Sequence, residues 1–165
     1  MRPDDGLPQL SQVKVRAAWA ASVLEEHALG ARVINNTSQT RPIVILVDDD
    51  PAVLSALQFS LELDGFEVRG FRDSISVLKS ADLPRKGCLV LDYNMPALNG
   101  LELLERLRQA GIDMPAILMT ASPTRLVRER ARQAGVSLIE KPFFDNELSQ
   151  GVRHLVASAS QENSE

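Results

Sequence analysis

Polar residues with reactive side chains stand directly after four of the apolar runs in this sequence. They are Asp48-Asp49-Asp50, Asp92, Thr120 and Lys141-Pro142. Continuous apolar runs rich in β-branched residues are typical of parallel strands that are buried on both faces. The carboxyl ends of parallel strands lie along one edge of a sheet, where ligands bind. We therefore expect several carboxylates, a hydroxyl and an ammonium to share one small site.

The chemistry that suits such a group of side chains is phosphoryl transfer with a divalent cation. Gathered carboxylates repel one another, and a hard cation relieves that repulsion. Mg²⁺ prefers oxygen ligands and commonly binds one or two carboxylates together with a phosphate. An ammonium and a hydroxyl suit phosphoryl oxygens, and carboxylate nucleophiles form aspartyl-phosphates in enzymes. The residue types therefore predict phosphoryl chemistry with Mg²⁺.

Predicted strands and helices alternate from about residue 41 onward. The strands are expected at 43–47, 66–71, 88–91, 116–119 and 136–139. The helices are expected at about 51–65, 73–81, 100–110, 123–135 and 145–157. Asp50 is the predicted N-cap of the first helix, while Ser122 and Pro123 are predicted to open the fourth as N-cap and first residue.

This alternation predicts an α/β fold. Short connections favour a doubly wound (βα)5 unit with a five-stranded parallel sheet and helices on both faces. The strand order 2-1-3-4-5, as in flavodoxin-like proteins, fits the pattern. The three continuous apolar strands are expected at the centre, and the alternating strand 66–71 at an edge.

Composition and charge narrow the class of protein. The chain has 165 residues, of which 44% are hydrophobic and 24% charged, as in a globular domain. Its net charge of -4 disfavours non-specific binding to nucleic acid or to anionic membranes. A lone cysteine, Cys88, and the lack of a long apolar stretch or signal peptide fit a soluble, cytoplasmic protein. We expect neither membrane insertion nor direct contact with nucleic acid.

Several segments resemble the receiver domain of two-component response regulators over about residues 41–157. The run from Leu91 to Gly100, LDYNMPALNG, is similar to the phosphoacceptor segment of that family. Val47-Asp48-Asp49-Asp50-Pro51 resembles its acidic cluster, Thr120-Ala121 its switch hydroxyl, and Lys141-Pro142-Phe143 its lysine-proline element. Asp48 and Asp92 stand 44 residues apart, and Asp92 and Thr120 stand 28 apart, as is usual there. The segments occur in the family's order, which makes the match specific.

The resemblance implies a role for each matching residue. Asp92 would accept a phosphoryl group from a phosphohistidine on a sensor histidine kinase or a histidine phosphotransfer protein. The expected Mg²⁺ ligands are Asp48, Asp49, Asp92 and the backbone carbonyl of Asn94. Thr120 and Lys141 would bind phosphoryl oxygens, and the Lys141–Pro142 peptide bond is expected to be cis.

One position departs from the family pattern. Leu138 stands three residues before Lys141, where receivers usually carry an aromatic side chain. The separation of 21 residues between Thr120 and Lys141 is also one shorter than usual. An aromatic side chain that swings inward with the hydroxyl is therefore not expected here, and Leu138 is either a smaller rotamer switch or part of a different readout.

Residues 1–40 form an extension outside the resemblance. Apolar residues recur at helical spacing from about 10 to 28, on two opposite sides of the predicted helix, and residues 35–40 read as a linker. Such a helix is expected to pack on the receiver, to form a homodimer or to dock on a partner. A segment that is mostly disordered is the alternative. Residues 158–165 are expected to be a disordered tail.

The leading functional hypothesis is a stand-alone response regulator, not an enzyme, which signals by phosphorylation-dependent protein binding or phosphotransfer. No output domain is expected to follow, and the downstream target is not indicated. A haloacid-dehalogenase-like phosphatase is a second hypothesis, since Asp48 and Asp50 have the spacing of its two aspartates; Pro51-Ala52 and the lack of a cap domain stand against it. A receiver-fold interaction module without phosphorylation is a third.

Overall fold

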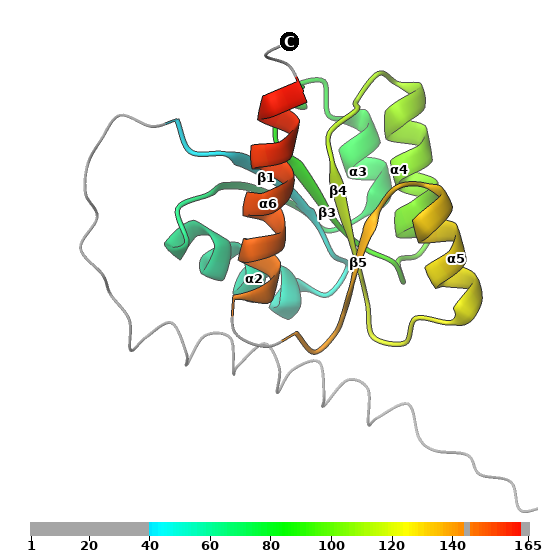
Figure 1. Ribbon diagram of the computed structural model, residues 1–165. Coiled ribbons are helices and arrows are strands. Elements are labelled where there is room, and N and C mark those ends of the chain that lie inside the picture. The colour runs from blue at the N-terminus through cyan, green and yellow to red at the C-terminus, as the bar shows by residue number, and fades with distance from the viewer. Residues whose placement is uncertain (1–39, 144–145, 163–165) are drawn as a thin grey trace, which may run out of the picture.

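The computed structural model describes residues 40–143 and 146–162, which form a parallel sheet flanked by helices (Figure 1). The five strands pair in the order β2-β1-β3-β4-β5, so the predicted α/β class and strand order are confirmed. The elements are β1 (Ile43–Val47), α2 (Pro51–Leu63), β2 (Glu67–Phe71), α3 (Ser74–Lys79), β3 (Cys88–Asp92), α4 (Gly100–Gln109), β4 (Ala116–Thr120), α5 (Arg125–Gln133), β5 (Ser137–Glu140) and α6 (Glu147–Glu162).

The burial of each strand matches its sequence pattern. Every residue of β3 and β4 is buried, as are four of the five residues of β1, so the continuous apolar strands occupy the centre. None of the residues of β2 is fully buried, and this strand lies at an edge of the sheet as its alternation predicts. Each large apolar side chain buried between strand and helix stabilises the fold by about 1.5–3 kcal/mol.

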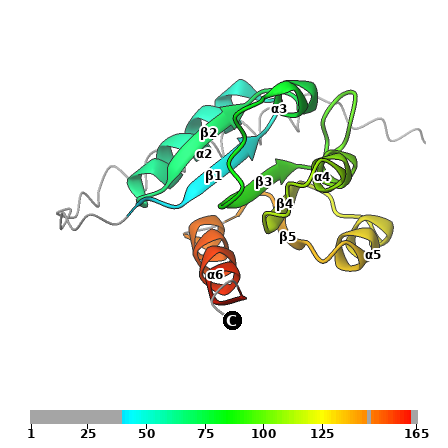
Figure 2. The same cartoon turned by 90° about the horizontal axis from the view of Figure 1, so that it is seen from above.

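Two apolar cores lie on the two faces of the sheet. One joins α2 and α6 to the sheet and includes Leu57, Leu61 and Val152. The other joins α3, α4 and α5 and includes Val77 and Leu104. Figure 2 shows α6 on one side of the strands and α4 and α5 on the other. Helices thus pack on both faces of the sheet, and the carboxyl ends of the strands lie along one edge.

The start of α5 differs from the prediction. Ser122 and Pro123 lie in the loop, and Thr124 is the N-cap, with its Oγ1 accepting a hydrogen bond from Val127 N at 3.2 Å. Ser122 N instead donates to Thr120 Oγ1 at 3.4 Å. The prediction was wrong because Thr124 competes for the same cap, and sequence alone does not rank two hydroxyl residues two positions apart.

Other boundaries shift by one or more residues. The last strand is Ser137–Glu140 rather than 136–139. Helix α3 ends at Lys79 instead of residue 81, because Ser80 has an extended backbone. Helix α6 continues to Glu162, so a disordered tail from residue 158 was wrong for 158–162, which extend the helix by more than a turn. The predicted helix at 10–28 and residues 163–165 lie outside the described residues.

None of the described helices combines the length and the apolar character that a membrane crossing requires.

Candidate functional site

The register of the sheet brings the predicted site residues to one edge. Asp92, the last residue of β3, pairs with Met119 of β4, and Thr120 pairs with Glu140 of β5. Backbone hydrogen bonds continue past the strand ends: Lys141 N donates to Thr120 O at 2.8 Å. Asp48 follows the last residue of β1, which is the neighbour of β3. The four strand ends therefore place Asp48, Asp92, Thr120 and Lys141 side by side, as predicted.

Lys141 joins two of the carboxylates. Its Nζ donates a hydrogen bond to Asp48 Oδ2 at 2.7 Å and another to Asp92 Oδ1 at 2.9 Å. All three side chains are buried: Asp48 is 0% exposed, Asp92 2% and Lys141 7%. Charges removed from water interact strongly, so the pairing compensates much of the cost of burying them. The ammonium fixes the Asp92 carboxylate in one position.

The three consecutive acids have different partners. Asp48 Oδ1 accepts a hydrogen bond from Asp50 N at 2.9 Å, which orients the Asp48 side chain. Asp50 caps α2, and its Oδ1 accepts from Ala52 N at 2.9 Å and from Val53 N at 3.3 Å. Asp50 is therefore a helix cap, as predicted, and the site itself is built from Asp48 and Asp49.

The residues present suit a hard divalent cation. One carboxylate oxygen from each of Asp48, Asp49 and Asp92 lies within 4.8 Å of the others. A set made only of carboxylate oxygens matches the preference of Mg²⁺ rather than that of softer metals, which favour nitrogen or sulfur. Asp49 is only partly buried, so the cluster lies near the protein surface. Asn94, the fourth predicted ligand, lies two residues past Asp92 in the loop and is exposed.

Thr120 is fully buried at the end of β4. Its Oγ1 accepts the hydrogen bond from Ser122 N, so the hydroxyl is engaged with the loop that leads to α5. The neighbouring Lys141–Pro142 peptide bond is cis, as predicted.

Leu138 and Tyr93 are packing residues. Both are partly buried against the core that α3, α4 and α5 cover. Leu138 pairs with Leu118 across the sheet, one residue pair before Met119 and Ile139. In this state the Leu138 side chain is thus part of the core and not a free surface group.

Gly100 lies against Asp92, a contact that its place in the motif did not predict. A Cβ at this position would lie 2.6 Å from Asp92 O and 2.6 Å from Leu118 Cδ1. Gly100 N also donates to Tyr93 O at 3.1 Å, which holds the start of α4 against the end of β3. Only glycine permits this close approach. The sequence predicts a helix that begins at Gly100, but the contact of this residue with Asp92 depends on the tertiary fold.

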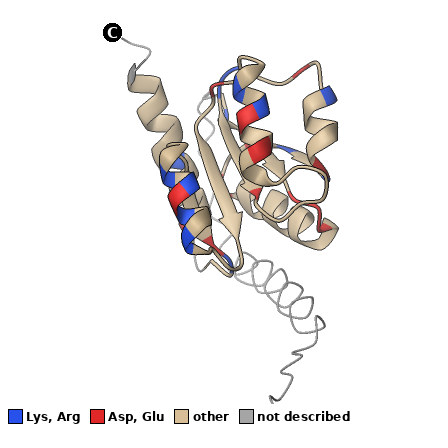
Figure 3. Cartoon of the chain, turned by 90° about the vertical axis from the view of Figure 1, so that its right-hand side faces the viewer, with Lys and Arg blue, Asp and Glu red and all other residues tan. Residues whose placement is uncertain are grey.

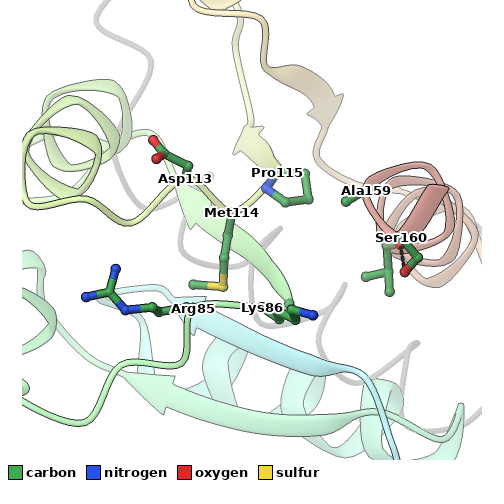
Figure 4. Close-up of a pocket in the computed structure, with 9 residues that line it drawn as sticks. Arg85, Lys86, Asp113, Met114, Pro115, Ala159 and Ser160 are labelled. Carbon is green, nitrogen blue, oxygen red and sulfur yellow. Dashed lines mark hydrogen bonds between the residues drawn. The ribbon is translucent and has the colours of Figure 1, made fainter. Parts of the chain in front are cut away.

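A separate pocket lies at the other end of the sheet (Figure 4). Its volume is about 270 Å³, and it contains Gly87 and Pro115, which precede β3 and β4. The remaining lining residues are Arg85, Lys86, Asp113, Met114, Val156, Ala159 and Ser160. None of the acidic-site residues lines it, so this pocket is not part of that site.

Comparisons with known proteins agree on one family. The family model of the response regulator receiver domain matches residues 44–153. The chain is 37% identical over 122 residues to the transcriptional regulatory protein PrrA of Mycobacterium tuberculosis, covering 73% of this chain and 52% of that protein. It is 36% identical over 114 residues to the response regulator MprA of Mycobacterium leprae, covering 68% and 50%. The chain thus spans about half the length of the curated relatives it matches.

Solved structures show the same fold. The crystal structure of FixJ-N has a TM-score of 0.66 and 32% identity, covering 72% of this chain and 96% of that one. The receiver domain of the Francisella response regulator 1452 has a TM-score of 0.66 and 26% identity, covering 72% and 99%. Because PrrA is named a transcriptional regulatory protein, the expected absence of contact with nucleic acid gains no support from the relatives. The match to the family model, the sequence relatives and the acidic edge of the sheet agree: this chain belongs to the response regulator receiver domains of two-component signalling.

Proposed function

We propose that Asp92 accepts a phosphoryl group from a phosphohistidine, on a sensor histidine kinase or a histidine phosphotransfer protein, in a reaction that requires Mg²⁺. The observation that carries the proposal is the placement of the Asp92 carboxylate, 2.9 Å from Lys141 Nζ and within one oxygen cluster with Asp48 and Asp49. A carboxylate held beside a cation and a metal site suits phosphoryl transfer, in which positioning and charge neutralisation supply most of the catalysis.

In the proposed reaction an Asp92 carboxylate oxygen attacks phosphorus. The new P–O bond forms as the N–P bond of the phosphohistidine breaks, and the electron pair of that bond returns to the imidazole nitrogen. Lys141 neutralises charge on the phosphoryl oxygens while remaining near Asp48. Asp48, Asp49 and the Asn94 carbonyl would hold Mg²⁺, which supplies further positive charge to the transferring group.

The proposed signal is a change in the loop between β4 and α5. Phosphorylation adds about one to two negative charges and three acceptor oxygens beside Thr120. Thr120 Oγ1, which now accepts from Ser122 N, would turn its proton toward a phosphoryl oxygen. The loop that carries Ser122 then shifts, and a protein partner that binds the two states with different affinity reads the change.

The test is the intact mass after incubation with Mg²⁺ and acetyl phosphate. Wild type and Asp50→Asn should each gain one phosphoryl group, since Asp50 caps α2 and Asn also caps a helix. Asp92→Asn should gain none, and wild type in excess EDTA should gain none. Labelling of Asp92→Asn at the wild-type rate would refute the acceptor. Continuous release of inorganic phosphate from added monoesters, with no retained label, would indicate a phosphatase instead.

A further inference from the structure

The outward side of α2 is unusually apolar. This helix spans Pro51–Leu63 and contains one charged residue, Glu62. The exposed residues of α2 are Pro51, Ala52, Ser55, Phe59, Glu62 and Leu63. Phe59 is 45% exposed and Leu63 53% exposed, and both lie on one side of the helix because they are four residues apart. Among the described residues no element covers the exposed part of these two side chains.

Two other helices, α4 and α5, have a different outward side. In α4 the outward positions include Glu102, Glu105 and Arg106, and α5 carries four arginines and a glutamate. Figure 3, which faces the side of the molecule where α4 and α5 lie, shows Lys/Arg and Asp/Glu segments on the helices there. Helices that face water carry polar and charged residues there, while a helix that is apolar on several sides is usually covered. The outward side of α2 therefore resembles an interface.

The chain enters the domain beside the end of α2. Glu67 N donates to Pro42 O at 3.0 Å, so residue 42 lies next to the turn that follows Leu63. Arg153 of α6 contacts the same turn. Its guanidinium donates a hydrogen bond to Asp64 O and lies 5.0 Å from the centre of the Phe66 ring. Residues 29–41 could reach about 40 Å if extended, whereas α2 is about 20 Å long. Residues 10–28 can therefore reach every part of the α2 surface.

We propose that residues 10–28 pack as a helix on the outward side of α2. On a helical projection six apolar residues of this segment share one side: Leu10, Val13, Ala17, Ala21, Leu24 and Ala28. The small alanines leave room for the large Phe59 and Leu63, and large side chains opposite small ones allow helices to approach closely. The occupant is thus a segment of the same chain, placed by its own linker. The contact does not depend on phosphoryl chemistry at Asp92.

Disulfide trapping in the full chain tests this contact. One variant combines Ser55→Cys with Ala17→Cys, and a second combines Ser55→Cys with Ala21→Cys to cover the neighbouring turn. The native Cys88 is 0% exposed and does not compete. After mild oxidation at high dilution, at least one pair should give a monomer lighter by two hydrogen atoms. Its yield should be several-fold above that of Leu126→Cys with Ala17→Cys, because Leu126 is 59% exposed on α5, on the other face.

Removing the apolar contact provides the matched comparison. Adding Phe59→Ser and Leu63→Ser to the trapped pair should lower the yield to that of the Leu126→Cys pair. Both side chains are partly exposed, and circular dichroism should show an unchanged fold. Equal yields for all three pairs, trapping that survives Phe59→Ser and Leu63→Ser, or disulfide-linked dimers as the main product would each overturn the proposal. The last outcome would assign the α2 surface to a second copy of the chain.

Discussion

Lys141 Nζ lies between two carboxylates at the ends of different strands, 2.9 Å from Asp92 Oδ1 and 2.7 Å from Asp48 Oδ2. A single ammonium thus links the end of β1 to the end of β3 across the site. The backbone N of Lys141 donates a hydrogen bond to Thr120 O, so the position of the lysine depends on the end of β4 as well. One residue therefore contacts the side chains of Asp48 and Asp92 and the backbone of Thr120.

Replacing Lys141 with methionine should destabilise the fold and slow phosphoryl transfer. Asp48 and Asp92 would remain buried without the cation, and breaking a buried ion pair from one side typically costs about 3–5 kcal/mol. Urea unfolding should show the loss, and added Mg²⁺ should restore part of it. Labelling by acetyl phosphate should slow by about 10-fold or more, a change equivalent to about 1.4 kcal/mol. Lys79→Met, at an exposed position on α3, should leave both quantities unchanged; unchanged labelling of Lys141→Met would contradict the role of the ammonium.

Replacing Asp49 with asparagine should weaken Mg²⁺ binding with little effect on the fold. The substitution removes one of three clustered carboxylates, and cation affinity falls with the number of charged ligands. Isothermal titration calorimetry should show the dissociation constant rising by about 10-fold or more. Asp50→Asn is the matched control because Asp50 caps α2 in the same acidic run. Equal losses in both variants would mean that general negative charge, and not the cluster, attracts the ion.

Replacing Gly100 with alanine should disturb Asp92, the proposed acceptor, directly. The new Cβ would meet Asp92 O at 2.6 Å, so either the end of β3 or the start of α4 must move. Overpacking of this kind costs about 1–3 kcal/mol. Both the free energy of unfolding and the rate of phosphoryl labelling should fall. Gly151→Ala offers a comparison within α6, where the nearest atom is the Ile117 Cδ1 side-chain tip at 3.2 Å; an equal loss in that variant would show that the contact with Asp92 is not special.

Replacing Ala97 with glycine should stabilise the loop after Asp92. Ala97 has a φ of 69°, in the left-handed region that disfavours side chains. Glycine removes a penalty of about 1–2 kcal/mol but adds about 0.4–1 kcal/mol of entropy to the unfolded chain. The net gain in thermal or urea stability should lie between about 0 and about 1.6 kcal/mol. A clear loss of stability would show that the Ala97 side chain makes a compensating contact.

Cys88 should be inert in the folded protein. Burial raises the pKa of its thiol from 9.0 to about 12, so at pH 8 almost none of it is the reactive thiolate. A maleimide should react only after unfolding in urea. As pH rises above 9.0, the thiol ionises in the unfolded chain before it ionises in the folded protein. The contribution of Cys88 to the free energy of unfolding should therefore fall between pH 9.0 and about 12. Cys88→Ala should remove this pH dependence. Fast labelling of the native protein would contradict the burial.

The strands and the acidic edge were predictable because their signals are local. Central parallel strands are buried on both faces and must be continuous apolar runs, which made β1, β3 and β4 recognisable. The polar residue after each of these runs, Asp48, Asp92 or Thr120, follows from the same pattern. The cap at Asp50 was predictable too, because an acid followed by proline is a strong helix start.

Residue types and short spacings were enough to predict the order of the elements, the residues at the acidic edge and the family. Three features came only from the folded structure: the two carboxylates that contact Lys141, the close approach of Gly100 to Asp92, and the outward direction of Phe59 and Leu63. The folded structure also decided that Thr124 rather than Ser122 caps α5. These features depend on distances between atoms far apart in the chain, and they are set only when the helices pack on the sheet and the register of the strands is fixed.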